Sequence, residues 1–291
     1  MQTAAALTMV RDDAFFLKAW LRHYGALFGR ENCYIVNHGR GSLVADLAAG
    51  CNVIGIPGDP HRNFDVKRWG MLNGFVDGLR KYYRHVIVGD VDELIVVDPQ
   101  TGQTLLDWLK AAKGGQVYTP LGLEVIHRPN LESDTADRQI LGPRRYVRTA
   151  AHYAKPGIVS TATKLSRGGH YAKQPDLLSP PELYLFHLKF CDFANYCGVM
   201  DQRNALAESV GAGHKNPSIG KHWFSAERGA DREVFDAFAK IPHRAGFDLS
   251  WMRDHMHATW GPRGDTGYFN FDMNKVDVVQ YTLPERFFGL F

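Results

Sequence analysis

Short apolar runs and longer segments of helical periodicity alternate over the first 120 residues of the chain. Continuous apolar residues predict five strands, at 4–10, 33–37, 51–56, 85–89 and 116–120. Apolar residues three and four positions apart predict three helices, at 12–29, 65–83 and 104–115. Asp12 or Asp13 can cap the first helix, and Gly29 suits the position after its end. Apolar strands separated by amphipathic helices are typical of a mostly parallel sheet with helices on both faces, so we expect an α/β fold.

The pattern becomes less regular after residue 120. Further strands are predicted at 155–166 and 182–190, where antiparallel pairing is one option, and helices at 192–210 and 230–240. The last 80 residues or so are rich in histidine, arginine and aromatic residues and are interrupted by prolines. We therefore expect a sheet domain over residues 1–200. A mainly helical or irregular C-terminal appendage over 201–291 would pack on it.

Composition narrows the class of protein only slightly. The chain has 291 residues, of which 45% are hydrophobic, and a formal net charge of +3. This near balance, without a long basic run, argues against a nucleic-acid surface. The four cysteines form no C-x-x-C pair and are expected to be reduced core thiols. With no apolar stretch of membrane-spanning length and no signal peptide, we expect a cytoplasmic protein without a transmembrane segment.

The stretch "HVIVGDVDELIVVD", residues 85–98, places Asp90, Asp92 and Glu93 directly after an apolar strand. In parallel sheets, ligands bind beyond the carboxyl ends of the strands. Carboxylates this close together require a cation or a shared proton, and their oxygens suit Mg²⁺ or Mn²⁺. A divalent ion bridging Asp90, Asp92 and a nucleotide diphosphate is the functional interpretation. A solvated acidic turn is the structural alternative, while the spacing of an EF-hand is absent.

Several segments together resemble one family. "MVRDDAFFLKAWLRHYGALFGRENCYIVNHGRGS" resembles the opening of the family 2-like glycosyltransferases of the GT-A fold, a Rossmann-like α/β fold. "KRWGMLNGFVDGLRKYYRHVIVGDVDELIV" is similar to the helix and strand that lead into that family's DxD metal motif. "AKPGIVSTATKLSRGGHY" and "LYLFHLKF" look like its later segments that return a histidine to the site. The resemblance covers about residues 5–195.

The resemblance implies a glycosyltransferase that uses a nucleoside diphosphate sugar, UDP- or GDP-linked, with Mn²⁺ or Mg²⁺. Asp92 would ligate the metal, and Asp90 would ligate it too or hold the ribose and metal waters. His187 and His170 are the candidates for a further metal ligand, and Glu93 is expected behind the ligands. The remaining residues expected near the nucleotide are Arg11, Asn37, Lys67, Arg68 and Lys189, with Asn73 a further candidate. Asn37 stands where the family usually has an aspartate near the base.

Family 2-like enzymes invert the sugar, and direct displacement needs a general base. Glu124 is the candidate for that base, and Asp176, Glu182 and Asp192 are its rivals. Aromatic residues could stack on a sugar ring, with Tyr118, Trp223 and Trp251 as candidates. The acceptor would be a glycan, a lipid-linked precursor or a protein in polysaccharide or glycoconjugate synthesis. A lipid-linked acceptor would be compatible with peripheral membrane contact.

Two other classes of protein stay open at this point. A nucleotidyltransferase would also use paired acids and a metal, although "MVRDDAFF" lacks the glycine-rich loop usual after its first strand. A non-catalytic nucleotide- or glycan-binding module could keep the same fold. P-loop chemistry and H-E-x-x-H zinc hydrolysis are excluded because their motifs are absent. His255 and His257 could share a metal on a strand but not on a helix, and we expect them to be structural or acceptor-side.

Overall fold

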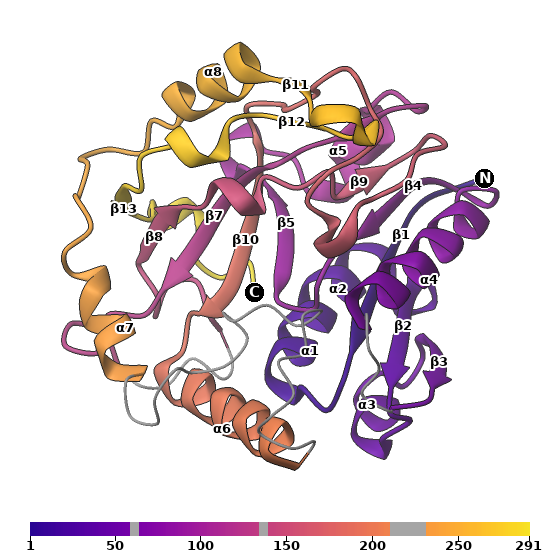
Figure 1. The fold of residues 1–291 in the computed structure, drawn as a ribbon, viewed down its shortest axis with the longest axis horizontal. Helices are drawn as coiled ribbons and strands as arrows, with labels where there is room; N and C mark the ends of the chain where they lie inside the picture. Colours follow the sequence, from indigo (N-terminus) through magenta and orange to yellow (C-terminus); the bar gives the residue numbers. More distant parts are fainter. Residues whose placement is uncertain (59–63, 134–138, 210–230) are drawn as a thin grey trace.

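The protein is described from a computed structural model, which covers residues 1–58, 64–133, 139–209 and 231–291 (Figure 1). A six-stranded sheet has the order β3-β2-β1-β4-β9-β6. Its strands are β1 (Gln2–Val10), β2 (Cys33–His38), β3 (Asn52–Ile56), β4 (Tyr83–Val88), β6 (Val117–Tyr118) and β9 (Ile158–Val159). The first four are parallel, and β9 runs antiparallel to β4 and β6. The predicted α/β fold with a mostly parallel sheet is confirmed.

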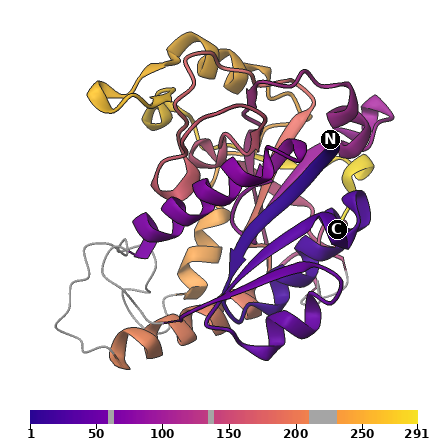
Figure 2. The ribbon, with the colours of Figure 1, turned by 90° about the vertical axis from the view of Figure 1, so that its right-hand side faces the viewer.

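Helices cover both faces of this sheet. Successive side chains along β1 point to opposite faces, and both sets are buried. Leu7 and its neighbours two positions away pack against α4 (Phe64–Leu79), which lies along one face (Figure 2). Ala6 and its neighbours belong to the main core on the other face. The elements there are α1 (Ala14–Trp20), α2 (Ala26–Phe28), α3 (Ser42–Leu47) and α5 (Leu105–Ala111).

The first predicted helix contains an interruption that its sequence pattern did not reveal. The side chain of Asp13 accepts a hydrogen bond from the Phe16 amide at 3.1 Å and thereby caps α1. A π-helical turn, η1 (Leu21–Gly25), then separates α1 from α2. Gly29 ends the segment with a φ of 83°, a conformation that favours glycine.

A second sheet follows β4 directly and has the order β13-β8-β7-β10-β5. Its strands are β5 (Glu93–Val97), β7 (Leu121–Ile126), β8 (Tyr146–Thr149), β10 (Leu183–Phe190) and β13 (Gln280–Thr282). The strand predicted at 182–190 is present as β10. Of the strand predicted at 155–166, only β9 forms, and the rest of that prediction is wrong. Further along this segment the amide of Leu165 donates to the side chain of Asn73 on α4 at 2.8 Å, instead of to another strand.

The C-terminal part packs against the second sheet and the main core. It contains α6 (Phe193–Ser209), α7 (Asp231–Phe238), α8 (Ser250–Thr259), and the strand pair β11 (Gly261–Pro262) and β12 (Phe269–Asn270). β13 pairs with β8, and Phe287 and Phe291 are buried in the main core. The division at residue 200 stays a prediction, but residues from beyond it complete the second sheet and the core. In the described part of the chain, no helix has both the length and the apolarity to cross a membrane.

Candidate active site

The acidic cluster lies at the carboxyl edge of the parallel sheet. Asp90 and Asp92 belong to the short link between β4 and β5. The sequence-consecutive strands β1, β2 and β3 extend to one side of β1, whereas β4 pairs on its other side. Ligands bind in the crevice at such a reversal. Both carboxylates keep contact with solvent, with 29% of the Asp90 side chain and 21% of the Asp92 side chain exposed.

Two basic side chains surround Asp90. Arg68, from α4, donates a hydrogen bond to Asp90 Oδ1 and also lies 3.5 Å from Asp65. Lys155 Nζ is 3.6 Å from Asp90 Oδ2 and forms an ion pair with Glu93. Burial opposes the charge on Asp90, but Arg68 and Lys155 outweigh it and lower its pKa. Asp90 is therefore ionised and already compensated by protein cations.

Asp92 faces the ring of His187. The distance from His187 Nε2 to Asp92 Oδ2 is 3.3 Å, and His187 is 3% exposed. Burial opposes the imidazolium, but Asp92 and Glu124 outweigh it and raise the pKa of His187 to about 9. Burial likewise opposes the Asp92 carboxylate, and His187 lowers its pKa to about 2. His187 and Asp92 therefore form an ion pair, and a metal ion bound between them would replace the proton on Nε2.

Three further residues bear on this pair that sequence reasoning missed. Lys155, 4% exposed, contacts Asp90 and Glu93. The ring of Tyr153 stacks on His187, with centroids 3.6 Å apart and planes inclined by 16°. Arg203, on α6, is close enough for its charge to favour ionisation of Asp92. No motif marks these residues, and only a lysine among apolar residues at 155 could have drawn attention.

Glu124 was expected to act as the general base, but its surroundings do not fit that role. It lies within β7, is 1% exposed, accepts from His187 Nδ1 at 2.8 Å, and forms an ion pair with Arg148. Burial raises its pKa, but the contacts with His187 and Arg148 outweigh burial and lower it. A buried carboxylate whose oxygens both have partners is poorly placed to take a proton from an acceptor.

The other candidates for the general base also lie outside the acidic cluster. Asp176 is exposed, and Glu182 accepts a hydrogen bond from the Trp108 indole at 2.6 Å. Asp192 is 3.2 Å from the buried Arg144. These contacts give Glu182 and Asp192 structural roles.

The residues predicted near a nucleotide lie around the same edge with different surroundings. Arg11 is exposed and donates to the Gly58 carbonyl at 2.9 Å. Asn37, at the end of β2, is 3% exposed and donates to the Gly41 carbonyl at 2.8 Å. Its Oδ1 atom has no hydrogen-bond partner among the described residues. Lys67 is exposed, and the charge of Lys189 is close enough to interact with Glu124 and Asp92.

His170 is not part of the Asp92 cluster. Its Nδ1 atom is 2.8 Å from the His152 carbonyl oxygen. Burial and the charge of Lys155 lower its pKa to about 3, which keeps the ring neutral. Asn73 has a structural role, because it joins α4 to the segment after β9. Its amide nitrogen donates to the carbonyls of Trp69 and Leu165 at 2.7 and 2.9 Å.

The other aromatic and histidine candidates have partners of their own. The hydroxyl of Tyr118 donates to the Lys113 carbonyl at 2.8 Å, and the Trp251 indole donates to the Tyr281 hydroxyl at 2.9 Å. Trp223 lies outside the described residues. His255 and His257 are both on α8, where residues two apart do not share a face.

The donor atoms near Asp92 fit a divalent ion. Within the described ranges, one group of acids and histidines can converge on a metal, namely Asp92, Glu93 and His187, whose ligand atoms lie within 4.8 Å of one another. Ligands adjacent on an octahedral ion with bonds of about 2.1 Å are about 3 Å apart. The 3.3 Å separation between His187 and Asp92 is close to this value. Carboxylate oxygens with one imidazole suit Mn²⁺ better than Mg²⁺.

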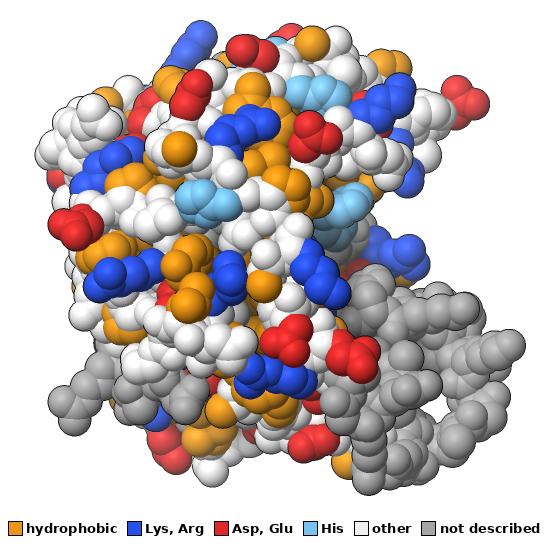
Figure 3. Space-filling model, turned by 90° about the vertical axis from the view of Figure 1, so that its left-hand side faces the viewer, with side chains coloured by type: hydrophobic (Ala, Val, Ile, Leu, Met, Phe, Trp, Pro, Cys, Tyr) orange, Lys and Arg blue, Asp and Glu red, His pale blue; other side chains and the backbone are white. Residues whose placement is uncertain are grey.

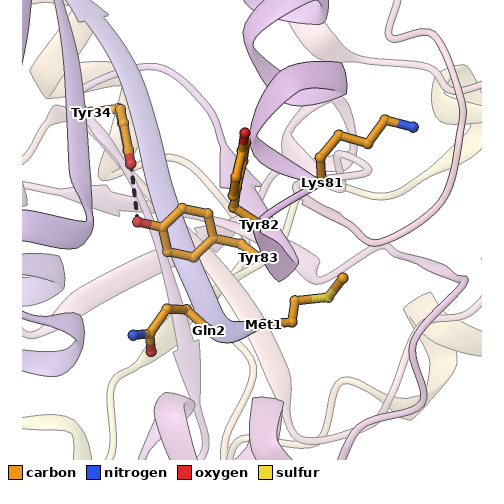
Figure 4. A pocket seen from close by; sticks show the side chains of 6 residues that line it. All are labelled: Met1, Gln2, Tyr34, Lys81, Tyr82 and Tyr83. Atoms are coloured by element: carbon orange, nitrogen blue, oxygen red, sulfur yellow. Dashed lines mark hydrogen bonds between the residues drawn. The ribbon is translucent and has the colours of Figure 1, made fainter.

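Figure 3 shows lysine, arginine and histidine side chains along the wall of a hollow at the right of that view. A separate open cavity of about 630 Å³ lies at the opposite end of the parallel strands (Figure 4). It is lined by Met1, Gln2, Tyr34, Lys81, Tyr82 and Tyr83. Because these residues lie at or near the beginnings of β1, β2 and β4, this cavity is not part of the acidic site.

Comparisons with known proteins add little. No known protein-family profile matches the chain, and no curated protein matches it. Among solved structures, the chain is similar to mannose-1-phosphate geranyltransferase from Thermus thermophilus, with 14% identity and a TM-score of 0.31. That similarity covers 97% of this chain and 74% of the other. At this level it carries no argument about function.

Proposed function

We propose that the protein is a metal-dependent glycosyltransferase that moves a sugar from a nucleoside diphosphate sugar to a hydroxyl acceptor. The observation that carries the proposal is the Asp92–His187 pair at the carboxyl edge of the sheet, with ligand atoms 3.3 Å apart. Asp92 and His187 would hold the ion, with Glu93 close behind. A divalent ion there supplies charge neutralisation for a departing diphosphate.

The basic residues of the site support an anionic ligand. Arg68, Lys155 and Lys189 approach the acids from α4, from the segment before β9 and from β10. Arg203 contributes a further positive charge near Asp92 from α6. In the proposed reaction these groups orient the diphosphate and stabilise its developing charge. Arg68 and Lys155 already balance the negative charge of Asp90. We therefore assign Asp90 to positioning these two cations and not to direct metal ligation.

Asn37 is a candidate for contact with the nucleobase. Its Oδ1 atom is buried without a partner among the described residues, beside the end of β1, where Val10 pairs with Asn37 in register. Buried acceptors without a partner are rare and costly. A base N–H group would satisfy this atom. Inversion, the identity of the general base and the acceptor stay predictions from the family resemblance.

The test is thermal unfolding with UDP, GDP, CMP or dTDP, each with and without Mn²⁺. We expect one nucleotide to raise the Tm only when Mn²⁺ is present, since a ligand at 100 times its Kd stabilises by about 2.7 kcal/mol. Asp92→Asn should abolish the rise. Asp77→Asn, on the solvent side of α4, is the matched control and should keep it.

A second assay separates the two kinds of transferase. Slow Mn²⁺-dependent release of nucleoside diphosphate from a nucleotide sugar supports a glycosyltransferase. Formation of pyrophosphate from a nucleoside triphosphate and a sugar phosphate would instead establish a nucleotidyltransferase. If no nucleotide shifts the Tm of the wild-type protein in the presence of Mn²⁺, the proposal is wrong.

A further inference from the structure

Four polar side chains stand in line across the second sheet. Glu93 on β5 pairs in register with His187 on β10, which pairs with Glu124 on β7. Glu124 in turn pairs with Arg148 on β8. Residues that are directly opposite on neighbouring strands project from the same face of a sheet. The strand register therefore brings these side chains together, although they are far apart along the chain.

Contacts join three members of this row to Asp92. Arg148 binds Oε2 of Glu124, and Oε1 of Glu124 is 2.8 Å from His187 Nδ1. The other ring nitrogen of His187 then faces Asp92 at 3.3 Å. Glu124 and His187 are 1% and 3% exposed, so water does not compete for these contacts.

Both ring nitrogens of His187 face a carboxylate, which can only accept a hydrogen bond, and a neutral imidazole has one N–H group to donate. A cation bound between Nε2 and Asp92 would take the Nε2 lone pair. The proton would then stay on Nδ1 and be donated to Glu124, 2.8 Å away. Metal-ligating histidines commonly donate their other N–H to a carboxylate in this way.

Arg148 supplies the charge that keeps Glu124 an acceptor. A carboxylate buried without a cation tends to take up a proton and could then donate instead of accept. The Arg148 guanidinium is held over the rings of Phe190 and Phe238, with 5.7 and 5.2 Å from its central carbon to the ring centroids. The stacked ring of Tyr153 restricts His187 from the side.

We infer that Glu124 and Arg148 are positioning residues that hold His187 in the tautomer and orientation required to bind a divalent cation beside Asp92. This inference rests on the proposed metal-dependent function and deepens it. It assigns Glu124 to a role that acts through His187, in place of proton transfer with an acceptor.

The test is Mn²⁺ binding, measured by the electron paramagnetic resonance signal of free Mn²⁺ during titration. We expect Glu124→Gln to weaken binding by about 10- to 100-fold, the usual effect of losing such a partner. Arg148→Met should also weaken it, whereas Arg148→Lys should restore most of the affinity. Glu132→Gln is the matched control, because Glu132 also accepts hydrogen bonds at both oxygens, from the amides of Arg128 and Arg145.

A second measurement separates positioning from loss of structure. The metal-free variants are compared by circular dichroism, and the ¹⁵N spectrum of His187 is recorded with Zn²⁺ bound. Wild type should show a protonated Nδ1 and a metal-bound Nε2, and Glu124→Gln should lose this pattern. If Glu124→Gln does not fold, the Mn²⁺ affinities of Arg148→Met and Arg148→Lys test the positioning role instead. Equal affinities in these two variants and wild type would overturn it.

The two proposals fail in different ways. If wild type binds no Mn²⁺, the proposed function is wrong, and the inference is wrong with it. If wild type binds Mn²⁺, Asp92→Asn does not, and Glu124→Gln binds as tightly as wild type, the positioning role alone is overturned.

Discussion

His23 is a buried histidine away from the acidic cluster. Its Nε2 atom is 2.7 Å from the Ile95 carbonyl, and its ring packs edge-on against Tyr24 and Phe291. Burial lowers its pKa to about 4, despite favourable backbone contacts. His23 is thus neutral in the folded protein at pH values where an exposed histidine would already bind a proton.

This shift predicts a loss of stability in acid. Below pH 6.5 the unfolded chain binds a proton at His23 that the folded chain takes up only near pH 4. The contribution of His23 to the free energy of unfolding is about 3 kcal/mol. It is complete above pH 6.5 and is lost as the pH falls toward 4. Urea unfolding at a series of pH values should show a smaller slope in this range for His23→Phe.

Other histidines also affect how the free energy of unfolding depends on pH, and one exposed histidine provides the control. Burial also lowers the pKa of His85 to about 4, so part of the dependence should remain in His23→Phe. His257→Phe makes the same substitution at an exposed position and should leave the slope of wild type in place. An unchanged slope in His23→Phe would contradict the assignment.

Individual elements differ in how closely their backbones approach one another. On β7, a Cβ at Gly122 would lie 2.4 Å from the Ala150 carbonyl oxygen and 2.5 Å from the Ala154 amide. Glycine at this position lets η4 (Ala151–Tyr153) lie against β7, which brings Tyr153 onto His187. On α4, a Cβ at Gly74 would meet nothing within 4 Å.

The same substitution should therefore have opposite effects on these two elements. Gly122→Ala should destabilise the protein by about 1–3 kcal/mol, because atoms are forced into a packed backbone contact. Gly74→Ala should stabilise it by about 0.5–1 kcal/mol, because alanine favours the helical conformation. Chemical denaturation measures both values, and effects of the same sign would contradict this account.

At the scale of the whole molecule, the C-terminal segment is integrated into the core. Phe287 is fully buried, and its ring lies near Tyr184 and Phe186 on β10, with centroids 5.9 and 5.7 Å apart. The neighbouring Arg286 binds both carboxylate oxygens of Asp98, next to β5. We therefore expect the sheet domain and the C-terminal part to unfold together.

Phe287→Ala tests this cooperativity. The substitution should lower the free energy of unfolding by about 3–5 kcal/mol. Tryptophan fluorescence and far-ultraviolet circular dichroism should still report one coincident transition. Val278→Ala, at a side chain that is 47% exposed, serves as the control and should change stability much less. Two separate transitions in the Phe287 variant would instead support an independent C-terminal unit.

The sequence alone determined the parallel part of the fold and the position of the acids. Strands β1 to β4 and helix α4 can be predicted from the local spacing of apolar residues, which depends only on residues a few positions apart. The same holds for the Asp13 cap and for Asp90 and Asp92 after β4. Since parallel strands end at one edge, a strand followed by acids predicts where a site lies.

Tertiary structure decided the partners of these acids. Lys155 reaches Glu93 across 62 residues of sequence, and His187 reaches Glu124 across 63. The His187–Glu124 pair follows from the register of β10 against β7, and Lys155 comes from the segment before β9. Local periodicity marks neither contact. Their basic partners then outweigh burial and keep Asp90, Asp92 and Glu124 charged. A local pattern can therefore locate the carboxylates, but only packing between distant strands determines what each carboxylate binds.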